Sequence, residues 1–122
     1  MYDHVSLKVK DYRKSKRFYE KALAPLGYKL QGEYGGSTAG FGAGQTTALW
    51  ISEGQPASSG AHIAFASPSR AAVDGFHVAA MEAGGRDNGA PGLRENYSFT
   101  YYAAFVYDPD GNNIEAVCHS KK

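Results

Sequence analysis

Residues 3–27 read DHVSLKVKDYRKSKRFYEKALAPLG, and this stretch decides the fold because it joins two hydrophobic periods. Val5 and Leu7 alternate with polar residues, and a period of two predicts a half-buried strand. Phe18 and its apolar neighbours then recur at helical spacing on one face. Pro25 lacks a backbone N–H and marks the end of that helix. The stretch therefore predicts a strand followed by an amphipathic helix.

The same pattern returns at residues 61–85, AHIAFASPSRAAVDGFHVAAMEAGG. When His62 is laid on His4, Phe76 falls on Phe18, and a glycine closes the helix in both copies. A shared order of strand, helix and glycine is the signature of an internal repeat. Neither copy alone can bury one face of its sheet, so we expect the two copies to pair.

The segments that follow each helix predict further strands. Residues 28–52 are short apolar stretches broken by glycine, and residues 101–107 and 113–118 are joined by Asp108-Pro109-Asp110-Gly111, a hairpin turn sequence. The segment 86–99 is interpreted as a loop over the predicted concave face. Each copy is therefore roughly a βαβββ unit.

These elements predict the fold class and the organisation of the chain. We expect one α+β domain in which two paired βαβββ modules form a curved mixed sheet, a cup with both helices on its convex side. Module one covers about residues 1–52 and module two about residues 61–119. Residues 53–60, EGQPASSG, have the composition of a linker.

Composition narrows the class of protein. The 122 residues weigh 13.1 kDa, enough for one domain but not for two. A formal net charge of +1 gives no electrostatic reason to expect nucleic acid or a membrane surface as a partner. No apolar run approaches the ~18 residues of a membrane span. The only cysteine, Cys118, cannot form an internal disulfide, so a cytoplasmic setting is expected.

Strand alternation predicts which side chains line the cup. Apolar positions of the strands should face the helices: Val5, Leu7, Leu49, Ile51, Ile63, Phe65 and Ile114. Their polar neighbours His4, His62 and Glu115 should then share the concave side. A bulge at Gly111 would also place Phe105 opposite Glu115. Two imidazoles and one carboxylate suit a divalent metal and leave coordination positions open for substrate.

Four segments resemble the vicinal oxygen chelate superfamily: DHVSLKV (3–9), FYEKAL (18–23), HIAF (62–65) and AFVYDPDGNNIEAV (104–117). This superfamily includes glyoxalase I, extradiol dioxygenases, fosfomycin-resistance transferases and bleomycin-resistance proteins. The resemblance implies paired βαβββ modules and, in metal-binding members, ligands at the positions of His4, His62 and Glu115. It also implies a homodimer, and leaves open whether the cup forms within one chain or across a swapped dimer.

One position departs from the family pattern. When Leu49 is laid on Ile114, Trp50 falls at the position that corresponds to Glu115. Glyoxalase-like members often carry a fourth ligand there, and an indole cannot bind a metal. A set of three ligands resembles the dioxygenase-like or fosfomycin-transferase-like pattern more than the four-ligand glyoxalase-like pattern. The acid–base histidine of extradiol dioxygenases has no evident counterpart, since neither His77 nor His119 is placed for it.

The remaining candidates would shape a substrate pocket. Trp50, Phe105 and Tyr101 either form an aromatic wall or simply fill the cup as core. Tyr97 and Arg94 would enter from the predicted loop, where Arg94 is either a clamp for a carboxylate or phosphate or a solvated side chain.

The sequence thus predicts an enzyme that uses one divalent metal ion (Fe, Mn, Zn or Ni) to chelate a small oxygen-bearing substrate. The reaction would be that of a lyase, dioxygenase or thiol transferase. The alternative is a metal-free protein that sequesters a small molecule or antibiotic, as bleomycin-resistance members do. A further alternative is a non-catalytic homologue whose cup is filled by aromatic side chains.

Overall fold

Each half of the chain forms a four-stranded sheet with one helix, in a computed structural model that describes all 122 residues. The first half consists of β1 (Val5–Val9), α1 (Tyr12–Leu23), the 3-10 helix η1 (Ala24–Leu26), β2 (Lys29–Tyr34), β3 (Thr38–Ala43) and β4 (Thr46–Glu53). The second half consists of β5 (His62–Ala66), α2 (Arg70–Glu82), β6 (Arg86–Leu93), β7 (Tyr102–Tyr107) and β8 (Asn113–Cys118). Neither helix is long and apolar enough to cross a membrane.

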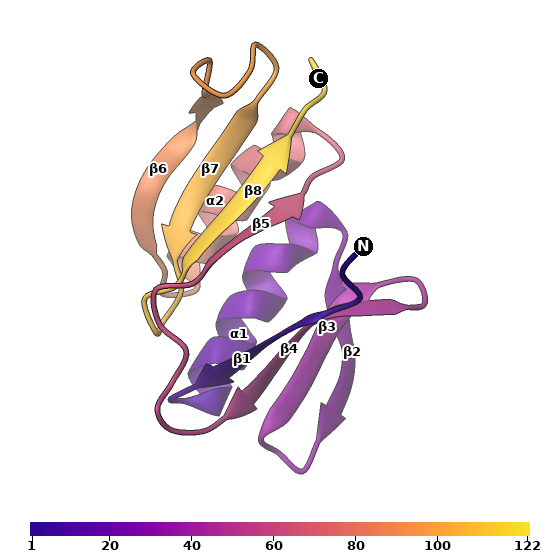
Figure 1. Cartoon of the computed structure of the whole chain (residues 1–122), viewed down its shortest axis with the longest axis vertical. Coiled ribbons are helices and arrows are strands. Elements are labelled where there is room, and N and C mark those ends of the chain that lie inside the picture. Colours follow the sequence, from indigo (N-terminus) through magenta and orange to yellow (C-terminus); the bar gives the residue numbers. More distant parts are fainter.

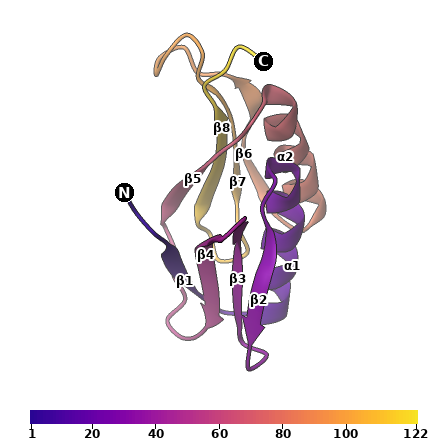
Figure 2. The ribbon, with the colours of Figure 1, turned by 90° about the vertical axis from the view of Figure 1, so that its right-hand side faces the viewer.

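The two sheets repeat one topology, which confirms the predicted pair of βαβββ modules. Their strand orders are β1-β4-β3-β2 and β5-β8-β7-β6. In each sheet the first strand pairs with the last in parallel, and the other pairs are antiparallel. Both helices lie on the same side of the sheets, and the other sheet faces are left open (Figures 1 and 2). The sheets are separate, because their hydrogen-bonded ladders end at β1 and β5.

Each helix begins just after a residue whose side chain caps it. The Asp11 carboxylate accepts a hydrogen bond of 3.1 Å from the backbone N–H of Lys14, and the Ser69 hydroxyl accepts one of 3.1 Å from Ala72. Each cap satisfies an N–H group that the first helical turn leaves free.

The core lies between the helices and the two sheets. The repeat-related Phe18 and Phe76 are fully buried in it. The chain after α2 passes very close to this core, since a Cβ on Gly85 would stand 2.4 Å from a Val106 methyl and 2.8 Å from the Phe18 ring. Only glycine fits this approach.

The hairpin turn between β7 and β8 forms as predicted and is tied to the first module. Asp108 is buried; its Oδ1 accepts hydrogen bonds from the backbone N–H groups of Asp110 and Asn112, at 2.9 and 2.8 Å. Its Oδ2 accepts hydrogen bonds from the Asn112 side chain and from the phenol of Tyr19 on α1. Gly111 takes a φ of 88°, which a turn residue with a side chain would resist.

The interpretation of residues 86–99 as a loop is wrong for its first part, because Arg86–Leu93 form the strand β6. This strand pairs only with β7, and its register shifts between Asp87 and Gly89 and again between Gly89 and Gly92. An edge strand tolerates Pro91 because one side of it needs no hydrogen-bond donor. Glycine, proline and two bulges hide the alternation by which a strand is recognised.

Candidate functional site

Three neighbouring strands place one residue each on the open face of the second sheet. Glu115 on β8 is paired with Ala64 on β5 and with Phe105 on β7, so the predicted register of Phe105 and Glu115 is confirmed. The residues on either side of Glu115, Ile114 and Ala116, are buried in the core. Alternation therefore directs Glu115 away from the helices.

The Glu115 carboxylate is almost completely buried, with an exposed fraction of 1%. Its Oε1 accepts a hydrogen bond of 2.8 Å from Nε2 of His62, whose side chain is 54% exposed. Its Oε2 accepts a hydrogen bond from the phenol of Tyr101. Burial, and then the hydrogen bond to Glu115, raises the pKa of Tyr101 to about 12, so this phenol keeps its proton at neutral pH. We call these three residues the Glu115 cluster.

Aromatic and cationic side chains surround the Glu115 cluster. The Phe105 ring centroid lies 6.2 Å from that of His62, and the Tyr97 ring meets Tyr101 edge-on at 5.0 Å. The Arg94 guanidinium carbon lies 5.3 Å from the Phe105 ring centroid. The predicted site residues of the second module are therefore brought together on one face: His62, Arg94, Tyr97, Tyr101, Phe105 and Glu115.

His4 is not brought to this face. It is exposed, and its Nδ1 lies 2.7 Å from the carboxylate of the adjacent Asp3. Strands β1 and β5 run in opposite directions across the gap between the sheets (Figure 1). His4 comes just before β1 and His62 is the first residue of β5, so the two histidines lie toward opposite ends of the gap.

Trp50 also lies apart, on the first sheet. Its indole covers Gly40, where a Cβ would come within 2.7 Å of the ring, and its ring centroid lies 5.9 Å from that of Tyr34. The indole therefore rests on its own sheet rather than against the Glu115 cluster.

The side chains of one chain supply only part of a metal site. Imidazole and carboxylate are suitable donors for the predicted divalent metals. His62 and Glu115 meet, but the chain contains no group of three or more His, Cys, Asp or Glu side chains that could hold a metal ion. A three-ligand site thus fits the donor chemistry of His4, His62 and Glu115 but not their positions within a single chain.

A cavity of about 230 Å³ lies between the modules, and it is not lined by the Glu115 cluster. Its lining is mostly apolar and comes from β1, β3, β4 and β5, from Leu23 of α1 and from Tyr28. The residues just before β1 complete it, so the predicted ligand His4 lines this cavity together with Tyr2 and Asp3. Ile63 and Phe65, which the sequence places in the core, border this cavity and are only partly buried. Tyr28 is a cavity residue that strand alternation gave no reason to select; its phenol donates a 3.0 Å hydrogen bond to the Ala66 carbonyl.

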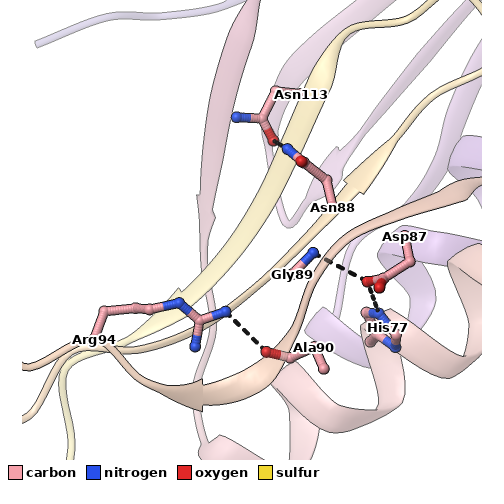
Figure 3. Close-up of polar contacts among 7 residues, drawn as sticks. All are labelled: His77, Asp87, Asn88, Gly89, Ala90, Arg94 and Asn113. Carbon is pink, nitrogen blue, oxygen red and sulfur yellow. Dashed lines mark hydrogen bonds and ion pairs between the residues drawn. The ribbon is translucent and has the colours of Figure 1, made fainter.

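His77 occupies the opposite side of the second sheet from Arg94 (Figure 3). Its Nε2 donates a 2.9 Å hydrogen bond to Asp87 on β6, and this bond holds the pKa of Asp87 below its usual value. The pair joins α2 to β6, so His77 serves the packing of the second module.

Comparison with known proteins identifies the family. The sequence model of the Glyoxalase/Bleomycin resistance protein/Dioxygenase superfamily matches residues 2–116, and the chain belongs to this superfamily. A glyoxalase/bleomycin resistance protein from Albidiferax ferrireducens T118 is 31% identical, with a TM-score of 0.83 over 97% of this chain and 98% of that one. A search of curated proteins finds no match.

Two further solved structures share the fold. A putative glyoxalase from Bacillus halodurans is 23% identical, with a TM-score of 0.72 over 97% of this chain and 95% of that one. A lactoylglutathione lyase from Agrobacterium tumefaciens is 17% identical, with a TM-score of 0.69 over 97% of this chain and 92% of that one. At these identities the likeness concerns the fold alone.

Proposed function

We propose that this chain is a metal-dependent enzyme of the vicinal oxygen chelate type that acts on a small oxygen-bearing substrate at the Glu115 cluster. The observation that carries the proposal is the buried carboxylate of Glu115, which faces the partly exposed imidazole of His62. A buried carboxylate is costly unless a cation or several donors balance it. A divalent ion between this carboxylate and imidazole would balance the charge and remain accessible from the open face.

The third ligand of the proposed site is His4, and the proposal includes a homodimer to supply it. His4 lies apart from the Glu115 cluster in one chain, so His4 of a second copy would complete the ligand set. A bound divalent metal would supply Lewis-acid chemistry to two adjacent substrate oxygens. Of the protein's own groups, Tyr101 would orient Glu115 through its hydrogen bond, and Phe105 would form a wall of the site.

The proposal excludes a four-ligand site of the glyoxalase I type. The position equivalent to Glu115 in the first module is Trp50, which offers no metal ligand and lies over Gly40. The three-ligand reactions of the superfamily, ring-cleaving dioxygenation and thiol addition to epoxides, are therefore the first to assay, followed by 2-oxo aldehydes with thiols.

Elemental analysis of untagged protein purified without chelator tests the proposal. We expect about one divalent metal per chain, and loss of most of it in His4→Ala, His62→Ala and Glu115→Gln. His77→Ala is the matched control, since it removes an imidazole that bonds to Asp87 away from the Glu115 cluster, and it should retain the metal. His119 is unsuitable as a control because its ring lies 5.2 Å from that of Tyr101. Metal-free wild-type protein, or equal metal content in all four variants, would contradict the proposal.

A metal-free binding protein is the second candidate, and the apolar cavity between the modules favours it. A cavity of about 230 Å³ has room for a small organic compound of no more than a few rings. This candidate predicts no stoichiometric metal, together with saturable binding of a small apolar dye that Phe65→Ala weakens.

A further inference from the structure

Arg94 is a half-buried cation that has no carboxylate partner. None of the four ion pairs of the chain includes it. Its Nη1 donates a 2.9 Å hydrogen bond to the Gly92 carbonyl, and its Nη2 donates one of 2.8 Å to the Ala90 carbonyl (Figure 3). A guanidinium carries five N–H donors. Three of them therefore remain free, on a group whose charge no nearby acid balances.

The bulged strand β6 holds this guanidinium in place. A Cβ on Gly89 would stand 3.1 Å from Nη2 of Arg94 and 3.0 Å from the Phe105 ring. A Cβ on Gly92 would stand 3.2 Å from Nη1. The two glycines, which flank register shifts of β6, thus leave room for the guanidinium to lie against its own strand. The position of the charge is set by backbone carbonyls rather than by a mobile side-chain partner.

The fixed charge lies on the same face as the Glu115 cluster. The Arg94 guanidinium carbon is 5.3 Å from the ring centroid of Phe105, and the same ring is 6.2 Å from that of His62. Phe105 is also the cross-strand partner of Glu115. A group attached to an anion bound at Arg94 would therefore have Phe105 beside it and His62 as the next neighbour of that ring, within about the two distances just given.

We infer that Arg94 binds a carboxylate of the substrate, and that the substrate class is a small carboxylate with a flat, unsaturated or aromatic portion. This inference rests on the proposed function for the position of the reacting end of the substrate. A carboxylate presents two coplanar oxygens to the free donors of the guanidinium, which gives charge-assisted hydrogen bonds of the stronger kind. Phe105 supplies an apolar surface for the planar remainder.

The test compares benzoate with benzamide, which has the same ring but no charge, by NMR titration of the full-length protein as purified. We expect benzoate to bind at least tenfold more tightly and to shift the Arg94 Nε–H resonance, because hydrogen bonds to a charged partner contribute roughly a tenfold to hundredfold difference in affinity. Arg94→Gln should bring the two affinities to within about twofold of each other, and Arg94→Lys, which keeps the charge but not the fork, should retain part of the preference.

Arg70→Gln is the matched control. Arg70 also lies over an aromatic ring, 5.1 Å from the Tyr102 centroid, but Tyr102 contacts Asp74 of α2 and so lies on the helix side. This variant should keep the full preference for benzoate. The inference is overturned by equal binding of benzoate and benzamide, by absence of binding of either at millimolar concentration, or by an undiminished preference in a folded Arg94→Gln protein. Tenfold tighter binding of phenyl phosphate than of benzoate would overturn the assignment to a carboxylate.

The metal content of the wild-type protein, measured beside the benzoate titration, separates this inference from the proposed function. If the protein prefers benzoate but binds no metal, the anion site is supported and the proposed metal-dependent function is contradicted. If the protein binds stoichiometric metal but does not prefer benzoate, only the proposal of an anion site at Arg94 is contradicted.

Discussion

The phenol of Tyr101 donates a hydrogen bond to Oε2 of the buried Glu115, while His62 occupies Oε1. The two oxygens of one carboxylate thus have partners from β5 and from the residue just before β7. This relationship fixes the orientation of the carboxylate within the second sheet, and it leaves the accessible imidazole as the side of the Glu115 cluster that faces solvent.

Removal of the Tyr101 hydroxyl should destabilise the protein. Tyr101→Phe leaves Oε2 of Glu115 buried without a donor, at an expected loss of about 1–3 kcal/mol in the free energy of unfolding. Urea denaturation followed by circular dichroism measures this loss. Tyr97→Phe, at a side chain that is mostly exposed, is the matched control and should change stability by less than about 0.5 kcal/mol. Equal effects of the two substitutions would show that the hydrogen bond to Glu115 does not stabilise the fold.

The raised pKa of Tyr101 predicts a loss of stability at alkaline pH. The folded protein holds this proton up to a pKa of about 12, whereas the ordinary pKa is 10.0. Between these values the folded state binds more protons than the unfolded state, so the free energy of unfolding falls as pH rises. The contribution is complete below pH 10 and disappears toward pH 12. The free energy of unfolding, measured by denaturation at several pH values between 9 and 12, should fall more steeply with pH for wild-type protein than for Tyr101→Phe. The same pH dependence in both proteins would contradict this assignment.

A methyl group at Gly85 should disrupt the junction between α2 and β6. The added Cβ of Gly85→Ala would lie 2.4 Å from Val106 and 2.8 Å from Phe18, inside a core that cannot move freely. Overpacking of this kind costs about 1–3 kcal/mol. Gly32→Ala is the control, since its Cβ would meet Tyr34 at an ordinary distance of 3.4 Å. Thermal denaturation of both variants checks the prediction, which fails if Gly85→Ala melts at the wild-type temperature.

Mixing His4→Ala with His62→Ala tests whether the proposed metal site is shared between chains. His4→Ala lacks the ligand of the first module, and His62→Ala lacks that of the second. If His4 of one chain serves Glu115 of another, a mixed dimer contains one intact site, and random exchange should restore about a quarter of the wild-type metal content. The mixture is denatured, refolded together and analysed for metal. Each variant refolded alone is the control, and a mixture as metal-free as its components would place all three ligands in one chain.

Much of the fold follows from local patterns in the sequence. Asp11 and Ser69 mark the helix starts, and the Asp108–Gly111 turn sets the register that places Phe105 opposite Glu115. These features depend on neighbours in the chain, where propensity and periodicity act directly. The strand β6 could not be found in this way, because its pairing with β7 is tertiary and its own sequence is rich in glycine.

The position of His4 could not be predicted for a different reason. Alternation assigns a side chain to one face of a strand, but it does not say how two modules are placed relative to each other. Here α1 packs on α2, and β1 and β5 share no ladder, so the distance between His4 and Glu115 depends on module placement alone. Because the two sheets share no hydrogen-bonded ladder, β1 and β5 are edge strands, and the cavity that Ile63 and Phe65 border lies between the modules.

The indole of Trp50, lying over Gly40, makes the two halves of this internally duplicated chain unequal. Where the second half has Glu115, the first half has a bulky ring that braces its own sheet. The two modules therefore differ at equivalent positions: the second presents a buried carboxylate, and the first presents an indole that packs on its own sheet. We therefore expect the fold to tolerate substitutions around β7 and the β6–β7 loop better than at Trp50, where a smaller residue would leave Gly40 uncovered.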